Sequence, residues 1–267
     1  MRALILAIVV FSLPIPFALA FDEGDAALLK TTNACPRCDL RGADLRGMNL
    51  TNANLEGAVL RDGDLKGSDL TGANLSRADL RRADVEKALA RGINLSGANA
   101  AGADFEKAVL VGADLSGADF RNADMEEADL EAANLDKANR SGADFKRANL
   151  SRATMRGARA EKTNFERANL AGVNASGTNF SWGDLDRAIL AGADLARANL
   201  ANARIKRADF SGVNLDGANL KDTVLRLTNF SGADLTGARG ITQEQLDRAC
   251  GDGATGLPAN LSIGICP

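Results

Sequence analysis

Two groups of side chains have the types and the spacing that could do chemistry. The first is two pairs of cysteines, one near each end of the chain: Cys35, Cys38, Cys250 and Cys266. A C-x-x-C pair can form a disulfide, exchange thiols or bind a metal. The second is a set of aspartates twenty residues apart: Asp44, Asp64, Asp84, Asp104, Asp124 and Asp144. Such a row of carboxylates could hold a cation or recognise a ligand.

Other kinds of chemistry are missing from the sequence. The chain has no His, so a Ser/His or Cys/His nucleophile pair cannot be assembled. Glycine recurs at turn positions, and no phosphate-binding loop stands out. The net charge is −3 and no long run of one sign occurs, which disfavours nucleic-acid binding. We therefore expect no enzyme, no catalytic residues and no cofactor.

The first twenty residues have the pattern of a secretory signal peptide. Arg2 precedes an apolar run, and the segment ends in a small-x-small motif at Ala20. An uncleaved anchor is the rival interpretation, but Pro14 and Pro16 interrupt the run. Cleavage after Ala20 would change the net charge to −4. It predicts a periplasmic or secreted protein without a membrane segment, and an organelle lumen is the alternative.

The remaining side chains are positioned by a repeat of five residues. Every fifth residue from 40 to 235, forty positions in all, is Leu, Phe, Ile, Met or Val. There are five exceptions: Ala90, Ala100, Arg140, Ala160 and Ala175. The residue before is mostly Asp or Asn, and the one before that is mostly Ala. A period of five fits neither a helix nor a strand, so the backbone must turn once per pentad. This pattern indicates a solenoid.

Charge placement indicates how many pentads make one coil. The two residues after each apolar position are both charged in seven successive members of one series, from Glu86-Lys87 to Lys206-Arg207, taken at intervals of twenty. Such pairs are scattered in the other three series. A twenty-residue modulation of a five-residue repeat predicts four pentads per coil and a square cross-section.

Segments such as "RGADLRGMNL" and "AGADLARANL" resemble the pentapeptide-repeat family, whose pattern is A-(D/N)-(L/F)-x-x. The resemblance covers residues 38 to about 239. It implies an all-β solenoid, a right-handed quadrilateral parallel β-helix of about ten coils with short terminal caps. The expected organisation is a signal peptide (1–20), an N-terminal cap (21–37), the β-helix (38–239) and a C-terminal helix and disulfide cap (240–267).

In such a rod the two cysteine pairs lie at opposite ends. Only Cys35–Cys38 and Cys250–Cys266 can then form disulfides within one chain, because the other pairings exceed the ~7 Å Cα limit. A redox motif or free thiols remain alternatives. Thr242 and Gln245 predict a helix with a capping box, Ile241 and Leu246 its hydrophobic staple, and Gly251 its end.

Arg140 occupies an interior position of the predicted rod, between Phe120 and Ala160. An unpaired buried guanidinium is costly, so we expect its pentad to bulge or the side chain to extend outward past Ala160. A bound anion is the functional alternative.

For the aspartates, the structural interpretation is that each accepts a hydrogen bond from its own turn. Nearby cations should neutralise the row: Lys66, Lys87, Lys107, Lys146 and Arg147. An exposed patch of Leu89, Val109 and Val111 is the candidate interaction site.

The preferred function is a non-enzymatic exported scaffold that binds an unknown protein partner. One alternative, implied by the family resemblance, is a DNA mimic that acts on gyrase, if the protein stays in the cytoplasm. The other is cation or small-ligand binding along the aspartates. The sequence leaves the oligomeric state open.

Overall fold

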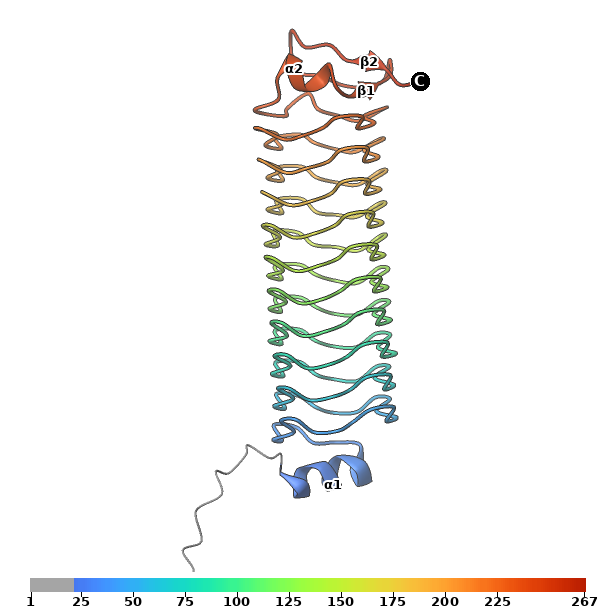
Figure 1. Ribbon diagram of the computed structural model, residues 1–267, viewed down its shortest axis with the longest axis vertical. Helices are drawn as coiled ribbons and strands as arrows, with labels where there is room; N and C mark the ends of the chain where they lie inside the picture. Colours follow the sequence, from blue (N-terminus) through green and yellow to red (C-terminus); the bar gives the residue numbers. More distant parts are fainter. Residues whose placement is uncertain (1–21) are drawn as a thin grey trace, which may run out of the picture.

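The computed structural model describes residues 22–267, so the predicted signal peptide at 1–20 lies outside the described residues. The chain forms a straight rod of stacked coils with a short cap at each end (Figure 1). Parallel bridges join residues twenty apart throughout, from Ala34↔Asn54 to Asn219↔Arg239. Each coil therefore contains four pentads, as the charge pattern predicts.

The hydrogen bonds of one pentad explain why five residues make a unit. In 116–120, the amides of Gly117 and Phe120 donate to the following coil, and that of Asp119 donates to the preceding coil. Ala118 N–H closes the turn onto the Leu115 carbonyl, and Ser116 N–H donates to the Asp114 side chain at 3.0 Å. All five N–H groups thus have partners, because Asp or Asn supplies the acceptor that the backbone lacks.

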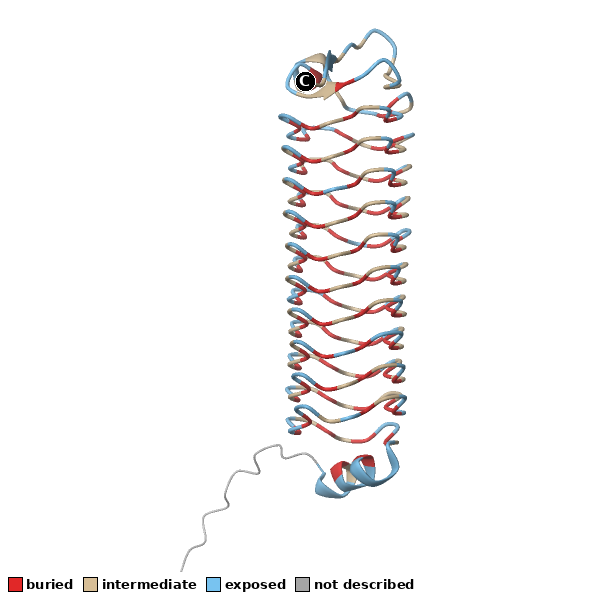
Figure 2. Cartoon of the chain, turned by 90° about the vertical axis from the view of Figure 1, so that its right-hand side faces the viewer, coloured by how far each residue is buried: buried red, intermediate tan, exposed pale blue. Residues whose placement is uncertain are grey.

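The interior is a continuous core made of the apolar residue of each pentad and the small residue two positions before it. Figure 2 shows these buried positions recurring along every coil. Aromatic residues pack between coils, as in the stacked pair Phe145–Phe165, whose ring centroids are 5.3 Å apart. The polar residues of each pentad are left on the outside in columns that follow the rod axis.

Helix α1 (Glu23–Thr32) covers the first coil. Its N-cap Asp22 accepts from the Gly24 amide at 2.8 Å, and its C-cap residue Asn33 is in the left-handed conformation. Ala26 and Leu29 are its buried residues. The helix thus places an apolar face on the open end of the core.

At the other end, α2 (Gln243–Leu246) begins with the predicted capping box between Thr242 and Gln245. The prediction that this helix stops at Gly251 is wrong: it ends at Leu246. Gly251 instead belongs to β1 (Cys250–Gly251), which pairs in parallel with β2 (Gly264–Ile265). The segment that contains α2 adds one residue to the spacing between bridged positions, since Asn229 bridges Cys250 and not residue 249.

Within residues 22–267, no helix is both long enough and apolar enough to cross a membrane.

Candidate functional site

The six aspartates form one unbroken column, because each bridges the residue twenty positions on, from Asp44↔Asp64 to Asp124↔Asp144. Each also accepts a hydrogen bond from the amide two residues later, with N···O distances of 2.8 to 3.3 Å. The structural interpretation is therefore confirmed. One carboxylate oxygen of each residue is used to hold its own turn.

The predicted cations form their ion pairs with acids outside this column. The hydrogen bond to Glu86 raises the pKa of Lys66, and the charges of Asp84 and Asp104 raise it further. Lys66 and Lys87 both pair with Glu86, and Lys107 pairs with Glu106. Lys146 and Arg147 pair with Glu126, at 3.0 and 3.6 Å. These glutamates stand two residues after an aspartate of the column, and each aspartate accepts a hydrogen bond from the amide of its own turn.

The electrostatics of the column differ along its length. Arg46 donates to Asp44 and lowers the pKa of that carboxyl to about 2. Burial raises the pKa of Asp104, and the charges of Asp124 and Asp84 raise it further. Within the described residues, no three acids of the column converge on a point that could hold a metal ion. The geometry gives no support to cation binding there.

The predicted apolar patch is smaller than expected. Leu89 and Val109 are ladder neighbours, but only Leu89 is well exposed, at 47%. Val109 and Val111 are half-buried. The three residues do not form a broad exposed surface.

Three further exposed apolar side chains lie toward the C-terminal end, and the sequence analysis missed them. Val224 and Leu227 are 42% and 55% exposed, and Ile265 in β2 is 84% exposed. Leu227 borders a hollow of about 830 Å³ that the Cys250–Cys266 disulfide also lines. A signal was present in the sequence: Val224 ends the column that begins with the aspartates, and Leu227 follows Arg207 in a column of mainly charged residues.

Arg140 corrects another expectation, because its pentad neither bulges nor sends the side chain outward. The residue is 0% exposed, and its amide donates to the Arg159 carbonyl at 2.8 Å within the regular ladder. The guanidinium carbon lies 5.7 and 6.0 Å from the ring centroids of Phe145 and Phe165, and Nη2 is 3.5 Å from Met155 Sδ.

Ala160, the next residue in the same column, is also fully buried. Arg140 Nε and Nη1 have no hydrogen-bond partner, and burial lowers the pKa of the group to about 10. Two aromatic faces thus offset part of the desolvation cost of a cation that keeps its charge at neutral pH.

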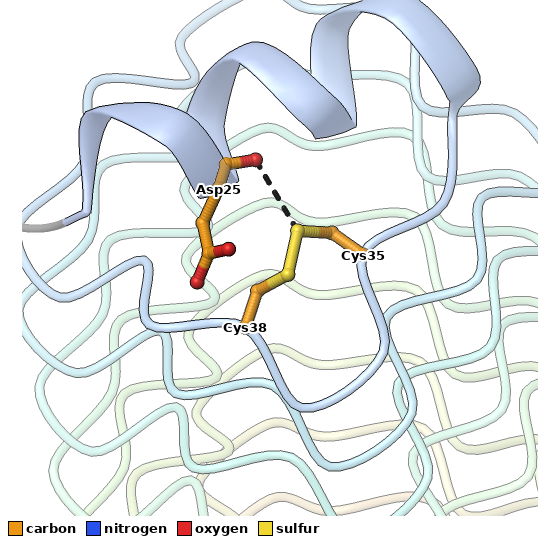
Figure 3. A group of neighbouring side chains, drawn as sticks. All are labelled: Asp25, Cys35 and Cys38. Atoms are coloured by element: carbon orange, nitrogen blue, oxygen red, sulfur yellow. Dashed lines mark hydrogen bonds between the residues drawn. A yellow bond between two sulfur atoms is a disulfide. The ribbon is translucent and has the colours of Figure 1, made fainter.

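Both predicted disulfides, Cys35–Cys38 and Cys250–Cys266, are present. At the N-terminal end, the carboxylate of Asp25 comes from α1 and faces the Cys35–Cys38 pair (Figure 3). The ligand atoms of the three residues all lie within 4.8 Å of one another. This proximity could not be predicted from the sequence, because it depends on how α1 folds over the first coil.

Comparison with known proteins agrees with this geometry. The family model for pentapeptide repeats matches in successive segments that together span residues 38–239. The chain belongs to the pentapeptide-repeat family. Membership implies that the square solenoid is a right-handed quadrilateral β-helix. No curated protein sequence matched the chain.

Several solved structures are similar to this pentapeptide-repeat chain. HetL from the cyanobacterium Nostoc sp. strain PCC 7120, a protein involved in regulating heterocyst differentiation, is 33% identical over 82% of this chain and 93% of its own, with a TM-score of 0.30. Full-length QnrB1, a plasmid-mediated fluoroquinolone resistance protein, is 22% identical over 59% and 86%, with a TM-score of 0.26. A thylakoid lumen protein from Arabidopsis thaliana is 33% identical over 41% and 66%, with a TM-score of 0.20.

Proposed function

We propose that this protein is a non-enzymatic scaffold that binds a protein partner at the C-terminal end of its rod. The observation that carries the proposal is the pair Val224 and Leu227, which are both exposed. Leu227 lines the 830 Å³ hollow, and Val224 lines a neighbouring hollow of about 620 Å³. Leu227 adopts a left-handed conformation with φ 61°. An exposed leucine at such a position has no stabilising role in the turn, which supports a role in contacts outside the chain.

The rim of this region suits protein recognition. Arg226 and Arg248 border both hollows. An apolar centre with polar edges is the usual arrangement of a protein interface. We expect the partner to insert apolar side chains beside Leu227 and to meet the two arginines at the edge.

The other functions receive less support. The gyrase-directed alternative needs a surface that imitates phosphates, but Glu86, Glu106 and Glu126 are paired with lysine and arginine. Cation binding along the aspartates would need converging ligands, and each of those residues is already bonded to its own turn.

The test uses three baits in affinity capture from envelope extract, followed by crosslinking. The first bait is the native protein. The second carries Val224→Asp and Leu227→Arg, which return both positions to the residue types of their columns. The third carries Leu89→Asp, a matched change that removes the exposed apolar residue of the predicted patch.

A partner lost only from the second bait, and bound again by purified native protein, supports the proposal. A partner lost only from the Leu89→Asp bait moves the interface to the patch of Leu89, Val109 and Val111. Equal retention by all three baits contradicts an apolar interface at either place.

We also propose that the chain is exported and cleaved after Ala20. The support is the charged start, apolar run and small-x-small motif of residues 1–20. N-terminal sequencing of protein from the periplasm or medium should begin at Phe21. Recovery of uncleaved protein from the cytoplasm would contradict the proposal.

A further inference from the structure

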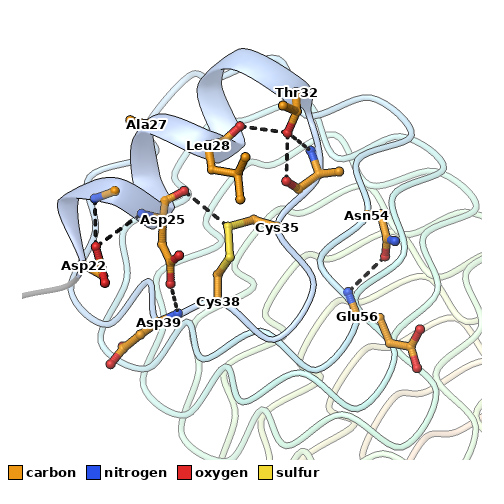
Figure 4. Close-up of a disulfide and its surroundings, with 12 residues drawn as sticks. Asp22, Asp25, Ala27, Leu28, Thr32, Cys35, Cys38, Asp39, Asn54 and Glu56 are labelled. Atoms are coloured by element: carbon orange, nitrogen blue, oxygen red, sulfur yellow. Dashed lines mark hydrogen bonds between the residues drawn. A yellow bond between two sulfur atoms is a disulfide. The ribbon is translucent and has the colours of Figure 1, made fainter.

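The cluster of Asp25, Cys35 and Cys38 is built from two separate parts of the N-terminal cap. Asp25 lies in the first turn of α1, and the two cysteines flank Pro36 and Arg37 in the loop that enters the first coil (Figure 4). Cys35 and Cys38 are 0% and 7% exposed, while Asp25 is half-buried. Two sulfurs and a carboxylate therefore share one partly covered site.

The loop keeps its shape through backbone contacts that do not involve the disulfide. The amides of Cys35 and Arg37 donate to the carbonyls of Asn54 and Glu56, both at 2.8 Å. The Cys38 carbonyl accepts from the Val59 amide at 2.8 Å. These three bonds belong to the ladder of the first two coils, so the two sulfurs would stay close together if the bond between them were reduced.

Asp25 is also held in place. Its Oδ2 accepts from the Asp39 amide at 2.8 Å, which leaves Oδ1 facing the sulfurs. The Asp25 carbonyl oxygen lies 3.2 Å from Cys35 Sγ, a distance at which a reduced thiol can donate to it. A carboxylate fixed by a hydrogen bond on one oxygen is the usual arrangement of a metal-binding carboxylate.

We propose that reduction of Cys35–Cys38 converts this cluster into a Zn²⁺ site. A dithiol reductant supplies two electrons and two protons, so that the S–S bond breaks, two cysteine thiols form and the reductant becomes its own disulfide. Zn²⁺ then binds Cys35 Sγ, Cys38 Sγ and Asp25 Oδ1, and both thiol protons are released. Water completes the tetrahedral geometry that zinc prefers.

The distances suit this geometry. Zinc bonds of ~2.0 to 2.3 Å require ligand atoms ~3.3 to 3.8 Å apart. The three ligand atoms already lie within 4.8 Å, and the Cα atoms of the two cysteines are 5.4 Å apart. After reduction the two sulfurs, which are bonded to each other in the disulfide, must rotate apart to reach this spacing. Unlike the disulfide, the metal would also tie α1 to the loop, because Asp25 belongs to the helix.

The test measures zinc binding to the purified full chain carrying Cys250→Ser and Cys266→Ser, so that one cysteine pair remains. The protein is reduced anaerobically with dithiothreitol, freed of reductant and titrated with ZnCl₂ against a chromophoric chelator. We expect one Zn²⁺ per chain in the reduced form, none in the oxidised form, and a higher Tm of the reduced protein with zinc.

Asp25→Asn should weaken zinc binding at least tenfold, since the amide is a poor zinc ligand but its oxygen can still accept from the Asp39 amide. Asp22→Asn is the matched control, because Asp22 caps the same helix outside the cluster, and its affinity should match the parent. Circular dichroism checks that each variant is folded. If the serine background does not fold, the same variants are compared with all four cysteines present, and alkylation with mass spectrometry identifies the protected pair. Absence of zinc binding by the reduced protein, or equal affinity of the Asp25→Asn variant, would overturn the proposal.

Discussion

The body of the rod repeats one hydrogen-bonding pattern, whereas each end relies on individual side chains. In the body, every amide of the pentad 116–120 is paired through the ladder, its own turn or the Asp114 side chain. At the N-terminal end, Asp39 lacks a preceding coil. Its carbonyl accepts from the Asp22 amide at 3.1 Å, and its amide donates to the Asp25 carboxylate.

The C-terminal end uses different means. The Gln245 side chain donates to the carbonyls of Leu220 and Thr223, at 3.2 and 2.8 Å. The hydroxyl of Thr255 lies 3.0 Å from the Phe230 carbonyl, and the Cys250–Cys266 disulfide fastens the last strand. These groups replace the coil that would otherwise follow, and they protect the open edge of the solenoid.

The difference shows where the fold tolerates irregularity. Arg140 enters the core of the body without disturbing a single ladder bond around it, because neighbouring coils hold its backbone from both sides. At an end, one side chain often satisfies several backbone groups that have no other partner. We therefore expect substitutions to act through packing and charge in the body and through lost hydrogen bonds at the ends.

The largest effect should come from Arg140→Met in the body. Methionine fills a similar length without burying a charge, so the free energy of unfolding should rise by about 3 kcal/mol, measured by urea denaturation. The pKa of Arg140 is lowered, so above about pH 10 the native arginine loses its proton and the penalty fades. The difference in the free energy of unfolding between the Arg140→Met variant and the native protein should therefore become smaller above about pH 10. Arg140→Lys keeps the charge and should be less stable than the native protein; a less stable Arg140→Met would contradict the packing argument.

The next effect distinguishes the two ends. Cys250→Ser with Cys266→Ser opens a link across a sequence separation of 16 and should lower the free energy of unfolding by about 3 kcal/mol. Cys35→Ser with Cys38→Ser opens a link of only three residues in a loop that the ladder also holds, so its cost should be about 1 kcal/mol. Thermal melts under oxidising conditions compare the pairs. If both double variants lost the same stability, the two disulfides would not differ in how much they stabilise their caps.

A smaller effect is expected from Gln245→Ala. The change removes two donors to the carbonyls of the last coil and one half of the capping box, at a cost of about 2 kcal/mol. Hydrogen exchange should show faster opening near the C-terminal cap and unchanged protection in the middle of the rod. Glu244→Ala is the control, because that side chain is exposed and only pairs with Arg248.

The smallest effects are expected at two aspartates of the body, Asp79 and Asp104. Replacing each should change the free energy of unfolding by less than about 1 kcal/mol, in opposite directions. The Arg81 side chain lowers the pKa of Asp79, with help from Arg61, so this carboxylate stabilises the fold above its unfolded pKa and the stability is lost as the pH falls. Asp79→Asn should therefore destabilise the protein at pH 7 and have little effect at acid pH.

Replacing Asp104 should have the opposite effect on stability. Burial and its like-charged neighbours raise its pKa, so its ionised form is unfavourable in the native state and stability from this group is lost as the pH rises. Asp104→Asn keeps the oxygen that accepts from the Glu106 amide and should stabilise the protein at pH 7. Urea denaturation from pH 3 to pH 7 measures how the stability difference between each variant and the native protein changes with pH. If this difference changed in the same direction for both variants, the opposite roles of Asp79 and Asp104 would be contradicted.

The repeat made the body predictable from the sequence. Because every fifth residue must point inward, the apolar positions of the core and the four pentads per coil followed from spacing. The turn-holding role of the aspartates followed from their residue type. The disulfides followed because each pair lies at one end of a rod. The capping box was predictable because Thr242 and Gln245 have the required types at the required interval.

The remaining features depend on choices that spacing does not determine. Arg140 could have displaced its backbone or been accommodated, and spacing alone does not reveal the two aromatic rings that lie beside its guanidinium. The C-terminal hollow lies beside α2, where bridged residues are no longer twenty apart, as at Asn229↔Cys250. The twenty-residue repeat therefore does not predict the structure of this end. The Asp25 cluster required the path of α1, which no repeat specifies.

Because residues twenty apart share a column, the length of the rod can change safely only in whole coils. Duplication or loss of twenty residues leaves every outer column continuous, so a binding surface at one end keeps its orientation relative to the other. An insertion of five residues preserves the core pattern equally well, but it rotates everything downstream by a quarter turn. The repeat thus allows two kinds of evolutionary change from the same unit: growth in steps of four pentads, and reorientation of one end against the other in steps of one.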